Sequence, residues 1–341
     1  MKVRKAVFVL MLFALCLLGG CVQKNQQTEE EAEETPLIGI SIYRYDDGFM
    51  KLYRDELEKY LQETYQARIV MRSARNSRLE QKEQVREFVS QGCDGVIVNL
   101  VSEDDGKVIT EVCRKAGVPV VFVNRVPSAE ETERWQEEKI QASSVSADFS
   151  QAAILQGEII LDTPNQGDIN GDGIVSCTFL MGEDNGKNSR QEIQYSVKTL
   201  EEAGLQTEVL YSGYGSWERQ RGKELAKKAV EAGEGRLEVI FCGNDTLALG
   251  AEEALEEAGI RPGQDIYLTG ADGLQEAVNA VSEGRLTGTV WNDYTSQSHL
   301  AADVLMNLID GKKEEVFYQV DYVKISMADA LEKNTDKERS R

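Results

Sequence analysis

Short apolar runs and amphipathic stretches alternate along most of this chain. The runs are rich in Val, Ile and Leu, which is typical of strands whose two faces are both covered by helices. The predicted strands are Leu37–Tyr43, Arg68–Arg72, Gly95–Leu100, Val118–Asn124, Ser143–Ser146, Val175–Gly182, Gln206–Ser212, Glu238–Gly243, Asp265–Gly270 and Gly288–Trp291.

Between these runs, apolar residues recur with the spacing of helices, for example in Phe49–Glu63, Arg78–Gln91 and Asp245–Ala258. Regular alternation of strand and helix predicts parallel sheets with right-handed crossovers. With 341 residues, the chain is long enough for two domains. The expected fold class is therefore α/β, with two Rossmann-like doubly wound parallel-sheet lobes joined by a three-segment hinge.

The predicted domain limits follow from where the pattern changes. The chain is expected to leave the first lobe near Ser144–Ala147, to return near Asn292–Thr295, and to cross again near Lys324–Met327. The N-terminal lobe would then comprise residues 37–145 plus 294–323, and the C-terminal lobe residues 146–293 plus 324–335. Residues 336–341 would form a tail.

Residues 1–20 have the pattern of a lipoprotein signal peptide. Basic residues precede the apolar stretch Ala6–Leu18, which is shorter than the roughly 20 residues that a membrane-spanning helix needs. The motif that ends at Cys21 resembles a bacterial lipobox, which predicts lipidation of the Cys21 thiol. The alternative is an ordinary signal peptide. The glutamate-rich residues 21–36 are expected to be a disordered tether, so the body would lie outside the cytoplasm, anchored by lipid to the outer face of the cell membrane.

The composition excludes several classes of function. The formal net charge is −21, which argues against nucleic acid and anionic membrane surfaces as partners. The single histidine, His299, offers no second imidazole for a zinc cluster, and no Ser-His-Asp arrangement is evident. An enzyme is therefore not expected, although paired carboxylates for glycoside hydrolysis remain an alternative.

Acids and amides follow several predicted strands. Because parallel sheets bind ligands at the carboxyl ends of their strands, these side chains predict a polar ligand in a cleft between two lobes. Carboxylates and amides can bind neighbouring hydroxyls, and the aromatic rings of Phe49 and Trp217 can cover the apolar face of a sugar. The alternative for each Asp or Asn alone is a helix N-cap. The strand-end residues are Asp46, Asp47, Asn99, Asn244, Asp245, Asp272, Asn292 and Asp293.

The segment Asp168–Ser176 matches the first half of an EF-hand loop. Asp168, Asn170 and Asp172 supply oxygens at positions 1, 3 and 5, Ile174 supplies a carbonyl, and Ser176 supplies a hydroxyl. This spacing predicts a structural Ca²⁺ site. Position 12 is not Glu, so a bidentate carboxylate must come from elsewhere, and the alternative is an Asx-rich turn.

Taken together, these motifs resemble the galactose/glucose-binding proteins, a family of type I periplasmic binding proteins. The resemblance implies an extracytoplasmic solute-binding lipoprotein, monomeric and without catalytic activity, that delivers a sugar or polyol to the permease of a carbohydrate ABC importer. A ligand sensor for a chemoreceptor or sensor kinase with the same fold is an alternative. The segments that carry the resemblance are Ile42–Met50, Val98–Val101, Val121–Asn124, the Asp168 loop, Gly243–Asp245, Gly270–Asp272 and Gly288–Asp293.

The resemblance also implies roles for individual residues. Asp47 and Asn99 would bind sugar hydroxyls from the first lobe, and Asn244, Asp272 and Asn292 from the second lobe and hinge. Phe49 and Trp217 would stack on the two faces of the sugar. Glu238 would complete the calcium shell of the Asp168 loop, and it is left open whether Ser176 or a water fills the remaining position.

One segment departs from the family. After Glu183 the family places a His, an Asp and an Arg that touch the sugar, whereas this chain has Gly186, Asn188 and Glu192 at those positions. Asn188 is still expected to bind ligand, and Arg190 lies two residues before the position of the missing Arg. Loss of a charged donor leaves buried acceptors unpaired. The ligand is therefore left open between galactose or glucose and another sugar, polyol or glycoside.

Overall fold

The computed structural model describes residues 35–183 and 187–332, without the side chains of residues 187–190 and 192. The chain divides into two units, Met1–Thr35 and Pro36–Arg341, and the elements described here all belong to the second. The predicted signal peptide, Cys21, nearly all of the predicted tether and the predicted tail lie outside the described residues. Within those residues, no helix combines the length and apolarity needed to cross a membrane.

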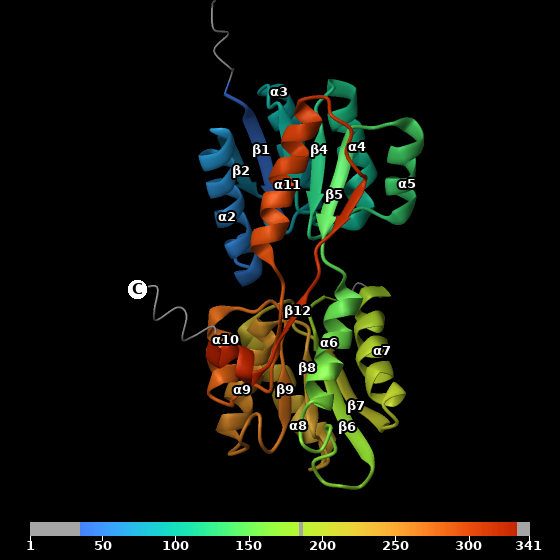
Figure 1. Ribbon diagram of the computed structural model, residues 1–341, viewed down its shortest axis with the longest axis vertical. Helices are drawn as coiled ribbons and strands as arrows, with labels where there is room; N and C mark the ends of the chain where they lie inside the picture. Colours follow the sequence, from blue (N-terminus) through green and yellow to red (C-terminus); the bar gives the residue numbers. More distant parts are fainter. Residues whose placement is uncertain (1–34, 184–186, 333–341) are drawn as a thin grey trace, which may run out of the picture. The chain divides into compact units, whose positions relative to one another are not determined.

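A six-stranded parallel sheet in the order β11-β5-β4-β3-β1-β2 forms one half of this unit (Figure 1). Helices α2 and α11 pack on one face, and α3, α4 and α5 pack on the other. Successive residues of β4 alternate between these faces, since Val121 and Val123 meet α11 whereas Phe122 stacks on Trp135 of α5. The strands are β1 (Leu37–Ile42), β2 (Arg68–Ser73), β3 (Gly95–Val98), β4 (Val120–Val123), β5 (Ala142–Ser146) and β11 (Phe317–Gln319). The helices are α2 (Gly48–Tyr65), α3 (Arg78–Ser90), η1 (Glu103–Asp105), α4 (Gly106–Ala116), α5 (Ala129–Glu138) and α11 (Tyr294–Ile309).

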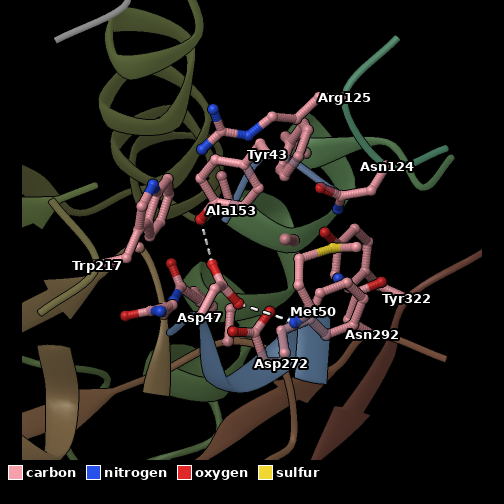
Figure 2. Close-up of a pocket in the computed structure, with 17 residues that line it drawn as sticks. Tyr43, Asp47, Met50, Asn124, Arg125, Ala153, Trp217, Asp272, Asn292 and Tyr322 are labelled. Carbon is pink, nitrogen blue, oxygen red and sulfur yellow. Dashed lines mark hydrogen bonds between the residues drawn. The ribbon is translucent and has the colours of Figure 1, made fainter. Parts of the chain in front are cut away.

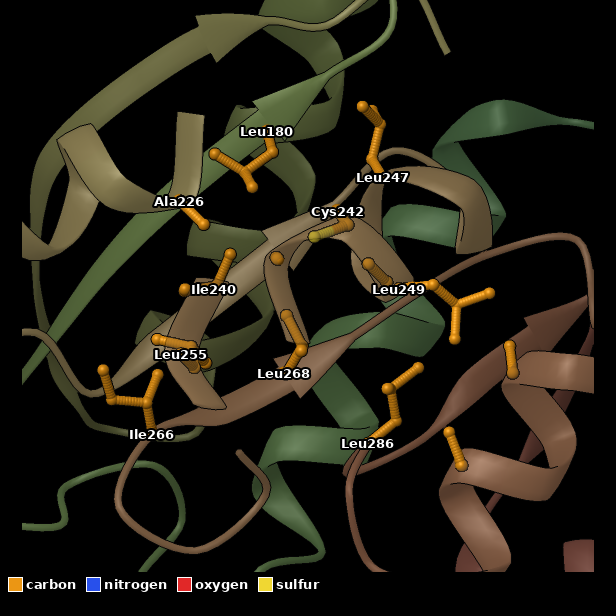
Figure 3. Packing of buried hydrophobic residues seen from close by; sticks show 14 of the residues in the cluster. Leu180, Ala226, Ile240, Cys242, Leu247, Leu249, Leu255, Ile266, Leu268 and Leu286 are labelled. Atoms are coloured by element: carbon orange, nitrogen blue, oxygen red, sulfur yellow. The ribbon is translucent and has the colours of Figure 1, made fainter. Parts of the chain in front are cut away.

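A four-stranded parallel sheet in the order β7-β6-β8-β9 forms the other half. In β8, Ile240 and Cys242 pack against α8 and α9, in the cluster shown in Figure 3, whereas Val239 and Phe241 pack against α6 and α7. The strands are β6 (Ile174–Met181), β7 (Gln206–Tyr214), β8 (Val239–Cys242) and β9 (Tyr267–Thr269). The helices are α6 (Phe149–Leu161), α7 (Lys187–Glu202), α8 (Arg219–Gly233), α9 (Asp245–Glu257) and α10 (Gln275–Ser282).

The chain passes three times between the two large sheets (Figure 1). It does so between β5 and α6, between β10 (Thr289–Trp291) and α11, and between β11 and β12 (Val323–Ile325). Strands β10 and β12 pair antiparallel and form a small sheet of their own. The prediction of two α/β lobes built on parallel sheets is confirmed.

The structure differs from the expected organisation in two details. Strands β11 and β12 were not predicted, because each has only three residues and contains exposed or polar positions. Since β12 already pairs with β10 at Val323, the third crossing lies between Gln319 and Val323, earlier than the predicted Lys324–Met327. The rest of the proposed domain limits stay a prediction.

Candidate functional site

A pocket of about 80 Å³ lies where the carboxyl ends of strands from both large sheets meet (Figure 2). Loops after β1, β4, β7, β8, β9 and β10 contribute to it, together with α6 and the segment between β11 and β12. This is the edge of a parallel sheet at which ligands bind. The lining residues are Tyr43, Asp47, Phe49, Met50, Asn124, Arg125, Phe149, Ala152, Ala153, Gln156, Trp217, Gly243, Asn244, Ala271, Asp272, Asn292 and Tyr322.

The structure brings most of the predicted ligand-binding residues together at this pocket. They come from loops far apart in the sequence, yet they line one cavity. The predicted residues that line it are Asp47, Phe49, Trp217, Asn244, Asp272 and Asn292. The side chain of Asn188, also predicted, lies outside the described residues.

The structure corrects the prediction for Asn99. Its side chain is fully buried beneath the end of β3 and does not line the pocket. Instead it donates to the Val123 carbonyl at 3.0 Å and to Asn124 Oδ1 at 3.2 Å. Asn124, at the end of the neighbouring strand β4, lines the pocket in its place.

Asp47 is held at the start of α2. Its Oδ1 accepts from the Met50 N–H at 2.8 Å as the N-cap of this helix, and its Oδ2 accepts from the Tyr43 hydroxyl at 2.5 Å. Burial, reinforced by the charge of Asp47, raises the pKa of the Tyr43 phenol, so the hydroxyl stays protonated and keeps donating. Asp47 is thus both a cap and a fixed acceptor in the pocket.

Two arginines of the first lobe contact loops of the second lobe beside the pocket. The Arg125 guanidinium lies 3.8 Å from the Tyr43 ring centroid and pairs with Glu183 at 3.2 Å. Arg44 donates to the Ser216 carbonyl at 3.0 Å. These contacts place a cation at the cleft and partly neutralise it with a carboxylate.

Asp272 is the acceptor that the second lobe presents. The side-chain amides of Asn292 and Asn244 donate to its carboxylate, while burial, followed by the charges of Asp245 and Asp47, raises its pKa well above the usual range. Its φ of 110° lies outside the regions that L-residues favour. Strain of this kind is concentrated at functional sites, where surrounding contacts hold it.

Asp245 lies behind Asp272 and is fully buried. Its two oxygens accept from the Thr289 hydroxyl at 2.5 Å and from the Leu274 N–H at 2.7 Å. Burial raises the pKa of Asp245 to about 7, although these hydrogen bonds oppose the shift. It does not line the pocket, so its role is to support the loop that carries Asp272.

Trp217 provides an aromatic wall from the second lobe. Its backbone has φ 63°, and its indole packs over Gly182, where an added Cβ would lie 2.0 Å from the ring. Only glycine at position 182 leaves room for this ring. Among the described residues, the buried indole N–H of Trp217 has no hydrogen-bond partner. It is therefore a donor that a ligand can use.

Sequence reasoning missed part of the lining. Asn124 and Arg125 carried a usable signal, since they follow an apolar strand in the same way as the residues that were selected. Tyr322 carried none, because it lies in a crossing segment that was not recognised as such. The residues that were missed are Tyr43, Met50, Asn124, Arg125, Phe149, Ala152, Ala153, Gln156, Gly243, Ala271 and Tyr322.

The Asp168 loop lies at the opposite edge of the four-stranded sheet, immediately before β6. Asp168 accepts from the N–H groups of Gly171, Asp172 and Gly173 at 2.8 to 3.1 Å. The Asn170 side chain accepts from the Asp172 N–H at 2.8 Å. The loop is therefore folded tightly around side-chain oxygens.

Glu238 reaches this loop from the start of β8. Its carboxylate accepts from the N–H groups of Asn170 and Ser176, each at 2.9 Å, and burial raises its pKa. Within the part of the chain that the structure describes, no three His, Cys, Asp or Glu side chains converge as a metal-binding group. The donor set that fits a hard cation includes an amide and a carbonyl, so Asp168, Asn170, Asp172, the Ile174 carbonyl, Ser176 and Glu238 are the residues that would hold it.

Two parallel-sheet lobes with a polar and aromatic cleft between them define the class of solute-binding proteins. Residues 38–313 match the family model described as periplasmic binding protein domain, and the chain belongs to this family. It is 30% identical over 279 residues to the D-galactose/methyl-galactoside binding periplasmic protein of Haemophilus influenzae, covering 81% of this chain and 82% of that protein.

Solved structures show the same fold. The arabinose-binding component of an ABC transporter from Shewanella, bound to arabinofuranose, has a TM-score of 0.79 at 21% identity and covers 89% of this chain and 96% of its own. A solute-binding protein from Bacillus halodurans with bound myo-inositol has a TM-score of 0.75 at 24% identity and covers 88% of this chain and 98% of its own.

Proposed function

We propose that this protein binds a monosaccharide or related polyol, similar to galactose or glucose, in the cleft and delivers it to the permease of an ABC importer. One observation carries the proposal: acids, amides and aromatic rings from both lobes line a single pocket. Asp47 and Asp272 accept from hydroxyls, asparagine amides donate to sugar oxygens, and Phe49 and Trp217 cover apolar ring faces.

The proposal involves binding and no covalent chemistry. A hinge of three crossing segments allows the lobes to open for ligand entry and to close around it. Paired hydrogen bonds give specificity, because an analogue that lacks one hydroxyl leaves a cleft group unpaired. One relative is named for binding galactose, and the two solved structures hold arabinofuranose and myo-inositol, which supports a hydroxylated ring without selecting among such rings.

Calorimetry tests this proposal directly. The purified body, residues 36–341, is titrated with D-galactose, D-glucose, methyl galactoside, D-ribose, L-arabinose, xylitol and myo-inositol. Binding of at least one of these near micromolar affinity, about −8 kcal/mol, is expected. The absence of heat with every compound would overturn the proposal.

We further propose that Ca²⁺ occupies the Asp168 loop and braces the second lobe without touching the ligand. A bound cation would supply the positive charge that the gathered oxygens of Asp168, Asp172 and Glu238 lack. These residues already fold the loop through backbone amides, so the metal would lock an existing conformation.

We propose that a lipid on Cys21 anchors the exported body to the outer face of the cell membrane. With this anchor the protein is expected to act as a monomer beside the permease. Cys21→Ser should release the exported protein from membranes into the soluble fraction, whereas Cys93→Ser, at a buried cysteine, should not. Persistent membrane association of Cys21→Ser would contradict the anchor.

A further inference from the structure

The three asparagines that line the cleft among the described residues share one property: the carbonyl oxygen of each side chain accepts a hydrogen bond from a neighbouring protein group. Asn124 Oδ1 accepts from Asn99 Nδ2 at 3.2 Å. Asn244 Oδ1 accepts from the Leu247 N–H at 2.9 Å, as the N-cap of α9. Asn292 Oδ1 accepts from Gln297 Nε2 at 2.5 Å. A carbonyl oxygen that is used in this way leaves the NH₂ group on the other side of the amide.

In the first lobe, Asn99 is itself fixed by the backbone. Its Nδ2 donates to the Val123 carbonyl at 3.0 Å, and its Oδ1 accepts from the Tyr43 N–H at 3.4 Å. Turning the Asn99 amide around would break both bonds inside a fully buried site. Asn99 therefore presents an N–H to Asn124, and Asn124 must present its oxygen in return.

At the second crossing between the lobes, Gln297 of α11 plays the corresponding part for Asn292. It is fully buried at the start of α11, where the Tyr53 hydroxyl donates to its backbone carbonyl at 3.2 Å. The Asn292 amide donates to the Asp272 carboxylate, which faces the charges of Asp245 and Asp47. Because Asn292 Oδ1 accepts from Gln297 Nε2, the NH₂ of Asn292 lies on the other side of the amide, where it meets Asp272.

We propose that Asn99 and Gln297 are positioning residues that fix the amides of Asn124 and Asn292, so that the cleft asparagines present N–H groups to the ligand. The side chains of Asp47 and Asp272 then serve as acceptors in the cleft. The ligand must place an oxygen lone pair opposite each amide and a hydroxyl hydrogen opposite each acid. This inference rests on the proposed function for its effect on binding, although the amide orientation itself does not.

Exchange of amide for acid in the cleft tests which side of each asparagine the ligand meets. If the ligand uses the amide N–H, Asn124→Asp or Asn292→Asp removes the donor and should weaken sugar binding by about 100-fold. Replacement of either asparagine by Leu should weaken sugar binding less, because no charge is added. If the ligand used the amide oxygen, Asp would keep the acceptor. Retention of affinity in both Asn→Asp variants, measured by calorimetry with the tightest sugar of the panel, would overturn the proposal.

The positioning role is tested at Gln297. In Gln297→Glu the ionised carboxylate cannot donate to Asn292, so the Asn292 amide is forced to turn, and sugar affinity should fall by about 100-fold at pH 8. Gln297→Met only removes the hydrogen bond to Asn292, and sugar affinity should fall by about 10-fold. Near pH 5 the buried glutamic acid is protonated and donates again, so its loss relative to the parent shrinks below about 10-fold. Equal losses in both variants without pH dependence would mean that Gln297 only fills space, and would overturn its role.

Gln151→Glu is the matched control for this change. It makes the same substitution at another glutamine near the crossing segments, but there the oxygen accepts from the Tyr322 N–H at 2.7 Å. Glutamate keeps that acceptor, so affinity should stay within about twofold at both pH values.

A measurement without ligand separates this inference from the proposed function. In ¹⁵N–¹H spectra the side-chain NH₂ signal of Asn292 is assigned by its loss in Asn292→Leu. The chemical shift of this signal should differ between the parent and Asp272→Asn. In Gln297→Glu the chemical shift of this signal should change as the pH rises. An Asn292 signal that is insensitive to Asp272 would overturn the inference, whether or not a sugar binds. If no compound of the panel binds the parent while this coupling is present, the proposed function fails and the amide orientation stands.

Discussion

The four-stranded sheet carries acidic groups at both of its edges, and the two sets are held in different ways. At the carboxyl edge, Asp272 accepts from the side-chain amides of Asn244 and Asn292. At the amino edge, Asp168 and Glu238 accept from backbone N–H groups of one tight loop. Carboxyl side chains therefore occupy two different hydrogen-bonding environments within one lobe.

These two kinds of contact suit the two edges to different ligands. Side-chain amides come from separate loops and can meet a ligand together with Asp272, so this edge can recognise a hydroxylated molecule. Backbone amides of a single loop fix the positions of several oxygens relative to one another, which is what a hard cation requires. Four predictions separate the two edges experimentally.

The largest effect is expected for Asp272→Ala. It removes a buried side chain that both cleft asparagines of this edge contact, and should weaken sugar binding by about 1000-fold, or on the order of 4 kcal/mol, while the protein stays folded. Calorimetry and circular dichroism measure the two properties. Asp265→Ala, at the exposed Arg261–Asp265 pair before β9, is the control and should bind like the parent. Unchanged affinity in Asp272→Ala would remove Asp272 from the site.

Asp245 should give the carboxyl edge a pH dependence of stability. Its pKa is about 7 in the folded protein, because of burial, and about 3.9 in the unfolded chain. The folded state therefore holds the proton more tightly, so its stabilising contribution is present below pH 4 and is lost as the pH rises through 7. Relative to Asp245→Asn, the free energy of unfolding of the parent should fall by on the order of 3 kcal/mol between pH 4 and pH 8.

Urea denaturation at a series of pH values measures this difference. Asp293→Asn, which caps α11 through the Ser296 N–H, is the matched control and should follow the parent. Parallel pH curves for the parent and Asp245→Asn would show that Asp245 ionises normally.

At the amino edge, removal of calcium should lower stability without affecting sugar affinity. At a concentration 100 times Kd the ion would stabilise the protein by about 2.7 kcal/mol, so a chelator should lower Tm by roughly 5–10 °C. Asp168→Ala or Glu238→Gln in calcium should melt near the value of the parent in chelator. Identical melting points of the parent with and without chelator would disprove the metal site.

The smallest effect is expected for Ser176→Ala. Its backbone N–H, which the substitution keeps, already donates to Glu238 at 2.9 Å. A water can replace the hydroxyl in a calcium shell, so calcium affinity should change by less than about threefold. Isothermal titration with calcium measures it, and a loss as large as that of Asp168→Ala would assign Ser176 as a direct ligand.

Much of the fold could be predicted because hydrophobic pattern and strand burial agree. Each predicted strand corresponds to one of β1–β10, and the helix that begins after Asn244 starts where its cap predicts. Strands β11 and β12 escaped prediction, since they are held by pairing with β5 and β10 and not by an apolar pattern of their own.

The candidate site was predicted less completely, and the error at Asn99 shows why. Asn99 and Asn124 both end apolar strands, so the sequence does not distinguish them. Their burial in the fold distinguishes them. The Asn99 amide donates to the Val123 carbonyl and to the Asn124 side chain, whereas Asn124 lines the pocket. Tyr322 enters the pocket only because the chain crosses between the lobes a third time.

Local pattern and spacing were enough to predict the α/β class, the strand ends that carry acids and amides, and the loop of oxygens around Asp168. The folded chain was needed to establish which strand-end residues share a cavity, which of them are buried beneath it, and which side of each amide faces inward. Those choices depend on the burial and hydrogen-bond partners that distant segments supply.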